Sequence, residues 1–194
     1  MSDWRETADA LRTALAVSPE NAPLRRHLGR VLSEGEAWAE AAEQWRWLWE
    51  HLPTGESGRA EAALRLALCL RATGELEGGD GAVAWLRRAV EAGADAGPEG
   101  DAAAVAVEAR LTLARWARDR VSGLTLAEGR QAYAEAVARQ PEAADLDLAA
   151  ALGPRLRAID VNPLLVRAAG RGVLALDALI DLEAAAGPSA VASQ

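Results

Sequence analysis

Two prolines, Pro19 and Pro53, stand 34 residues apart and enclose two helix-length segments, each with one apolar stripe. Within each stripe the spacings are mostly three or four residues, as on one face of an α-helix. The stripes comprise Leu24, Leu28, Val31 and Leu32 in the first segment, and Trp38, Ala41, Trp45, Trp49 and Leu52 in the second. Pro53 ends the second helix, because proline lacks a backbone N–H and restricts the preceding residue. The pattern predicts a pair of packed helices.

This segment, APLRRHLGRVLSEGEAWAEAAEQWRWLWEHLP, resembles a tetratricopeptide repeat. Its glycine between the two helices, Gly35, stands one place early relative to the repeat pattern. The residues that match the repeat positions are Leu28, Gly29, Leu32, Ala41, Trp45 and Pro53. The resemblance implies stacked helical hairpins that form a curved solenoid, whose concave face binds segments of other proteins.

The same organisation extends, less regularly, over residues 1–141. Residues 3–17 are typical of the second helix of an incomplete first repeat. Further helices are predicted at 58–73, 80–92, 101–120 and 125–139, with a linker at 92–100. Ala, Leu, Glu and Arg are frequent, and all are strong helix formers. We therefore expect a mainly α fold, a helical-hairpin solenoid of the tetratricopeptide type.

Composition excludes several classes of function. All 21 positive charges are arginines, so chemistry that needs a lysine nucleophile or a phosphate-loop lysine is absent. The net charge of −8 argues against nucleic-acid binding, which needs a basic surface. No stretch reaches the roughly 18 apolar residues of a membrane helix, so we expect a cytoplasmic protein. Cys69, the single cysteine, is interpreted as a small core residue rather than a reactive thiol.

Arginines recur on the first helix of successive repeats, which in this family lines the concave face. An arginine cluster there can bind a carboxylate or an acidic peptide; an ordinary solvated helix face, balanced by nearby Glu, is the competing and favoured interpretation. Trp47 points about 200° away from Trp45 by helix geometry, and either packs on a neighbouring repeat, which is the favoured interpretation, or is an exposed anchor. The candidate partner-binding residues are Arg25, Arg26, Arg30, Arg59, Arg65 and Trp47, with Arg71 in a comparable place.

Residues 142–183 show a different pattern. A helix is predicted at 142–152, followed by two β-type segments, 158–166 and 172–180, around a loop consistent with a hairpin. The runs IDVNPLLV (159–166) and GVLALDA (172–178) resemble the end of the ATP-grasp domain of nucleoside-diphosphate-forming acyl-CoA synthetases, including the succinyl-CoA synthetase β subunit. Residues 184–194 are interpreted as a disordered tail.

The second resemblance implies a magnesium–nucleotide site. Asn162 and Asp177 match the positions that hold the magnesium of bound ADP or ATP, and Asp160 replaces an acidic residue beside it. Strand alternation independently places Asp160 and Asn162 on one face, with Asp177 opposite them after an antiparallel return. The phosphate-binding lysines and the adenine pocket of that family are missing, so a complete ATP-dependent ligase is not expected.

Three functional hypotheses follow. The leading one is a non-catalytic scaffold for protein–protein interaction. The alternative is an accessory or partial subunit of an ADP-forming acyl-CoA synthetase that contributes Mg²⁺–nucleotide ligands from its hairpin. In the third, the hairpin is purely structural and the chain is a pseudoenzyme. The hairpin's edges also offer a route to strand addition or oligomerisation.

Overall fold

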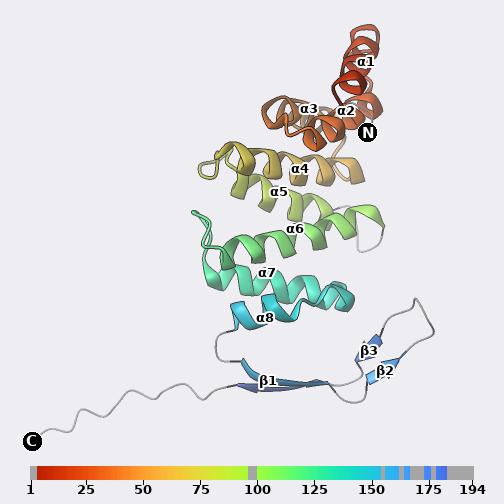
Figure 1. The fold of residues 1–194 in the computed structure, drawn as a ribbon. Coiled ribbons are helices and arrows are strands. Elements are labelled where there is room, and N and C mark those ends of the chain that lie inside the picture. The colour runs from red at the N-terminus through yellow and green to blue at the C-terminus, as the bar shows by residue number, and fades with distance from the viewer. Residues whose placement is uncertain are drawn as a thin grey trace, which may run out of the picture.

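The computed structural model describes residues 4–95 and 100–153, together with the backbone of four short strands between residues 156 and 182. Within these residues the protein is mainly helical (Figure 1), which confirms the predicted class. The α-helices are α1 (Trp4–Val17), α2 (Ala22–Glu34), α3 (Trp38–His51), α4 (Ser57–Thr73), α5 (Ala82–Asp95), α6 (Asp101–Arg118), α7 (Leu126–Arg139) and α8 (Leu146–Leu152).

The helices stack in the order of the sequence. Each of α1 to α6 packs against the helix that follows it, and α4 also contacts α6. Ion pairs connect helices that are two apart in the chain: Arg12 of α1 binds both carboxylate oxygens of Glu40 on α3, at 2.8 and 2.7 Å. Arg87 of α5 reaches Glu128 of α7 at 2.7 Å. The arrangement is a layered helical array, which Figure 1 shows running from α1 at one end to α8 at the other.

The pair α2–α3 is built around one tryptophan. Trp45 on α3 is fully buried, and it lies directly against Gly29 on α2. A Cβ atom at position 29 would lie 2.8 Å from Cε2 of the indole, which is closer than real Cβ contacts allow. Glycine at this position therefore permits the two helices to approach across the large side chain.

Helix α5 differs from the prediction of a helix at 80–92. It begins at Ala82 and continues to Asp95, through Gly93. A Cβ atom at Gly93 would lie 2.6 Å from the backbone oxygen of Ala102 on α6, so the two helices touch at this glycine. The contact outweighs the cost of about 1 kcal/mol that glycine imposes within a helix. The linker predicted at 92–100 is correspondingly shorter, and residues 96–99 lie outside the described part.

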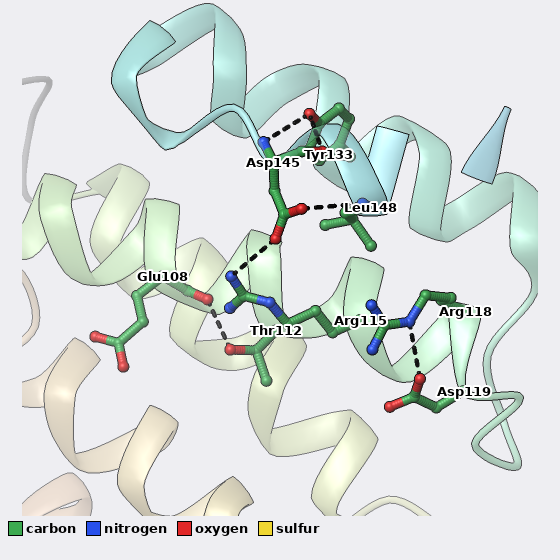
Figure 2. A network of polar contacts seen from close by, with 8 residues as sticks. All are labelled: Glu108, Thr112, Arg115, Arg118, Asp119, Tyr133, Asp145 and Leu148. Carbon is green, nitrogen blue, oxygen red and sulfur yellow. Dashed lines mark hydrogen bonds and ion pairs between the residues drawn. The ribbon is translucent and has the colours of Figure 1, made fainter. Parts of the chain in front are cut away.

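The predicted helix at 142–152 is divided. Pro141–Ala143 form a 3-10 turn, and α8 begins only at Leu146. Asp145 caps α8, because its Oδ1 accepts a hydrogen bond from the Leu148 N–H at 3.0 Å (Figure 2). The Tyr133 hydroxyl on α7 accepts from the Asp145 N–H and donates to its carbonyl oxygen, both at 3.1 Å. These contacts set where α8 starts and hold it on α7.

Four short strands follow α8. Strand β1 pairs antiparallel with β4, and β2 pairs antiparallel with β3. Their bounds are β1 (Leu156–Val161), β2 (Leu164–Val166), β3 (Val173–Ala175) and β4 (Ala178–Leu182). The loop predicted between residues 166 and 172, and the tail predicted at 184–194, lie outside the described residues.

Candidate functional site: the α4 groove

A groove of about 800 Å³ opens beside α4. It lies between the end of α2, the start of α3 and the C-terminal half of α4, and we call it the α4 groove. Its lining residues are Ser33, Glu34, Trp38, Arg65, Leu68, Cys69, Arg71, Ala72 and Leu76. The lining combines apolar side chains with two arginines and one glutamate.

The groove exists because α4 continues past the end of α2. Arg30 of α2 contacts Glu61 in the N-terminal half of α4, and Ser33, close to the end of α2, lies 3.9 Å from the Cys69 sulfur. Helix α4 continues beyond this contact to Thr73, whereas α2 ends at Glu34. Arg65, Leu68 and Ala72 are three and four residues apart, so one face of α4 presents them together.

Within the part of the chain that the structure describes, the two arginines of the groove have no acidic partner. The Arg65 side chain is half-buried, and its buried Nε–H has no hydrogen-bond partner among the described residues. The Arg71 guanidinium lies over the ring of Trp116 on α6, 4.9 Å from the ring centroid. Neither arginine forms an ion pair within residues 4–95 and 100–153. The groove therefore holds two positive groups with unused donors.

Cys69 lies at the base of the groove but is almost fully buried, with 1% of its surface exposed. Burial raises the pKa of its thiol, which keeps the sulfur protonated and unreactive at neutral pH. The interpretation of Cys69 as a small core residue fits this environment.

Arg25 and Trp47 belong to a different part of the molecule from the groove. The Arg25 guanidinium lies 4.2 Å from the Trp47 ring centroid, and the His51 ring stacks on Trp47 at 4.0 Å. Arg25 also donates to the carbonyl oxygen of Pro19 and to the Gln44 side chain. Burial lowers the pKa of Arg25. These contacts connect α2 with α3 of the same hairpin, so Trp47 packs within its own helix pair.

Arg26 and Arg30 converge on one carboxylate. Arg30 binds Glu61 at 2.6 Å, and Arg26 lies 3.5 Å from the other oxygen of the same group. Glu61 is 15% exposed, so the three charges form a partly buried connection between α2 and α4. Both arginines therefore have an internal partner.

Arg59 is occupied in a similar way. It donates to the Leu52 carbonyl oxygen and to Thr54, and it lies 4.2 Å from the Trp49 ring centroid.

Of the six predicted partner-binding residues, the structure places only Arg65 in the α4 groove. Trp38 and Leu76 also line it, and the sequence contained no signal for this, because the groove depends on how far α4 extends past α2.

Of the three predicted metal ligands, only Asp160 lies within the described residues. Asn162 and Asp177 lie outside the described residues, and Asp160 is described only by its backbone in β1, where it pairs with Leu179. Elsewhere in the described part of the chain, no three His, Cys, Asp or Glu side chains are grouped as a metal site requires. None of the helices described has the length and apolar character of a membrane span.

No protein-family model matches this sequence, and no curated protein shows significant similarity to it. The class that the fold defines is a layered array of consecutively packed helices with a groove beside α4.

Proposed function

We propose that this protein is a non-catalytic interaction scaffold of the tetratricopeptide type that binds a segment of a partner protein in the α4 groove. The observation that carries the proposal is the groove itself. Its walls come from α2, α3 and α4, so a ligand there would contact two neighbouring helix pairs at once. Helical-repeat proteins offer extended surfaces of this kind to peptides.

The chemistry of the lining supports a peptide ligand. Trp38, Leu68 and Leu76 supply apolar contact area, while Arg65 and Arg71 supply hydrogen-bond donors. Ligand sites combine a mainly apolar surface with a few polar groups that fix orientation. The groove is open along one side of α4 rather than closed, which suits a chain segment better than a small metabolite.

Filling the groove tests this proposal. Short random peptides displayed in a library are selected on the wild-type chain, and their affinities are then measured on Ala72→Trp. Ala72 is exposed at the groove, so the indole occupies the groove without disturbing the core. We expect the selected peptides to bind this variant at least about tenfold more weakly, a change of about 1.4 kcal/mol.

Ala138→Trp is the matched control. Ala138 is also exposed on a helix, but it lies on α7, outside the groove. Peptides that bind both variants equally well, or a selection without any peptide above background, would show that the α4 groove is not the binding site.

A second candidate function rests on the register of the strands. Val161 pairs with Ala178, and Leu164 pairs with Ala175. Leu164 lies three residues after Val161, and Ala175 lies three residues before Ala178. The β1–β4 pair and the β2–β3 pair therefore have the same antiparallel register. A single hairpin, which the sequence predicts, is consistent with this shared register. In the sequence, Asn162 directly follows Val161 and Asp177 directly precedes Ala178. This placement next to one strand pair supports their proposed role as Mg²⁺–nucleotide ligands of an accessory synthetase subunit.

Calorimetric titration of Mg²⁺–ADP and Mg²⁺–ATP into the purified chain tests the second candidate. This candidate predicts saturable binding that the double variant Asn162→Ala/Asp177→Ala loses. The same titration with the Ala72→Trp variant should be unchanged, because the groove is made by other elements. Absence of heat from wild-type protein would leave the hairpin without a nucleotide-binding role.

A further inference from the structure

Helices α2, α4 and α6 end in the same kind of cap. Two backbone hydrogen bonds close the last turn of each; after α6 they run from the Arg120 N–H to the Ala117 carbonyl oxygen at 3.1 Å and from the Val121 N–H to the Trp116 carbonyl oxygen at 2.9 Å. The residue that donates the first of these bonds has a positive φ, as is usual in this cap. The residues at this position are Glu36 (φ 58°), Gly74 (φ 87°) and Arg120 (φ 58°).

Arg120 therefore has a backbone conformation that is unfavourable for it. In the left-handed region the Cβ atom of an L-residue comes too close to the following carbonyl oxygen. Glycine avoids this contact, and Gly74 occupies the equivalent place after α4. Arginine at this position lowers stability, and strained residues of this kind are common at binding sites.

The Arg120 side chain lines a second pocket, at the turn between α6 and α7. The pocket has a volume of about 330 Å³, and we call it the α6–α7 pocket. Leu126 is 40% exposed there, one of two large apolar side chains that the described part of the chain leaves exposed. The pocket therefore offers apolar surface beside positive charge. Its lining residues are Ala117, Arg118, Arg120, Val121, Ser122, Leu124, Leu126 and Ala151.

Arg120 has the unpaired charge of this turn. Its side chain is exposed and forms no ion pair with any residue that the structure describes. Three acidic side chains around the turn already have partners within the chain, so none of them is left to neutralise it. The pairs are Arg118–Asp119 at 2.9 Å, Arg87–Glu128 at 2.7 Å and Ser122–Glu77.

The α6–α7 pocket is connected to the α4 groove along one edge of the stack. The turns that follow α4 and α6 both lie at this edge (Figure 1), and Arg87 on α5 donates to the Gly123 carbonyl oxygen at 3.1 Å. A hollow of about 280 Å³ lies between the two turns, and Leu76 and Gly123 are among its lining residues. Leu76 also lines the α4 groove, and Gly123 stands between Ser122 and Leu124 of the α6–α7 pocket. The groove, the hollow and the pocket therefore form one row.

We propose that the partner segment bound in the α4 groove continues along this row into the α6–α7 pocket, where it places an apolar side chain on Leu124 and Leu126 and a carboxylate on Arg120. The inference rests on the proposed function and adds a second contact point with its own chemistry. A chain segment suits a row of connected hollows, whereas a small molecule would occupy only one of them. Charge complementarity with Arg120 selects the acidic residue, and the apolar contact supplies most of the affinity, because an exposed ion pair alone is weak.

Replacement of Arg120 by glycine tests the inference through two opposite effects. Random peptides of about 15 residues are selected on the wild-type chain, since an extended peptide of this length spans about 50 Å and can follow the whole row. We expect Arg120→Gly to weaken binding of the selected peptides about fivefold. The same variant should raise the melting temperature by about 2–4 °C, because glycine removes the backbone strain. Misfolding cannot explain weaker binding by a more stable protein.

Glu36→Gly is the matched control for the backbone. It removes the same strain in the turn between α2 and α3, and Glu36 lines neither the α4 groove nor the α6–α7 pocket. We expect the same rise in melting temperature without a change in affinity. Arg120→Lys, which keeps the charge, should retain most of the binding.

Two further changes test the chemistry of the contact. Replacing the acidic residue of a selected peptide with its amide should weaken binding to the wild-type chain but not to Arg120→Gly. Leu126→Asp places a charge where the apolar side chain of the peptide would bind, and should weaken binding about tenfold. Leu126 is the first residue of α7, where an acidic side chain is compatible with the helix.

The outcomes separate the two proposals. Peptides that are weakened by Ala72→Trp but bind Arg120→Gly and Leu126→Asp normally would overturn the inference and leave the scaffold function standing. Peptides weakened by the Arg120 and Leu126 variants alone would show that no single segment spans both places, and would also contradict binding in the α4 groove. Equal affinity of the acid and amide peptides for the wild-type chain overturns the proposed carboxylate contact. If no peptide binds the wild-type chain, both proposals fail.

Discussion

Trp45→Ala is expected to lower the free energy of unfolding by about 3–5 kcal/mol, the range for truncating a large aromatic side chain in a core. Trp45 is fully buried on α3, and Gly29 on α2 leaves room for its indole ring because it has no side chain. Alanine at this position leaves a cavity at the centre of the α2–α3 pair, which the helices cannot fill without moving closer together. Chemical denaturation followed by far-ultraviolet circular dichroism measures the change.

Trp47→Ala is the matched control for this prediction. Trp47 is on the same helix but half-buried, and its main contacts are with Arg25 and His51. We expect a loss of only about 1–2 kcal/mol, from one cation–π contact and partial burial. Equal losses for the two variants would mean that Trp45 is not the central core residue of the pair.

Glu135→Ala is expected to destabilise the protein by about 1–2 kcal/mol because it leaves a buried cation without its partner. The Arg110 side chain on α6 is 5% exposed, and its Nε donates to Glu135 on α7 at 3.0 Å. Removing one member of a fully buried pair costs more, but Glu135 itself is 44% exposed and solvent replaces part of the interaction. Thermal and chemical denaturation at pH 7 measure the loss.

Arg110→Leu distinguishes the penalty of the unpaired charge from the value of the pair. An apolar side chain needs no ion-pair partner, so we expect this variant to lose less stability than Glu135→Ala. A larger loss for Arg110→Leu would show that the pair itself contributes net stability, and would contradict this account of the α6–α7 contact.

The pH dependence of stability provides an independent check on the same pair. The hydrogen bond from Arg110 lowers the pKa of Glu135 below its ordinary value of 4.5. A carboxylate with a lowered folded-state pKa contributes stability that is fully present above the unfolded value and is lost as pH falls below it. Between pH 7 and pH 5 the contribution of Glu135 should therefore be constant, and below about pH 4.5 the difference between wild type and Glu135→Ala should shrink.

Local periodicity was enough to predict where most of the helices lie, although not the ends of α5 or the start of α8. Leu28 and Leu32 in the first stripe, and Trp45 in the second, are buried as their spacing implied. The end of α3 before Pro53 follows from the chemistry of proline, and the start of α2 follows from Asn21, which caps it. These features depend on residues within a few positions of one another, so the sequence determined them without reference to the rest of the fold.

Other features depend on which helices meet, and only the tertiary structure decided them. Gly93 remains within α5 because α6 packs on it, although glycine alone argues for a helix end. Arg26 and Arg30 were predicted to bind a partner. In the structure both form ion pairs with Glu61, which lies 31 residues after Arg30. Ion pairing over such a separation leaves no local trace in the sequence.

The α4 groove illustrates the same limit for the candidate site. The sequence predicted that Arg65 would lie on the first helix of a helix pair, α4 and α5 in the structure. It did not determine that α4 extends beyond α2, or that Arg71 would be held over Trp116, 45 residues later in the chain. Helix faces follow from spacings of three and four residues, whereas a groove follows from the packing of whole helices, which only the tertiary structure reveals.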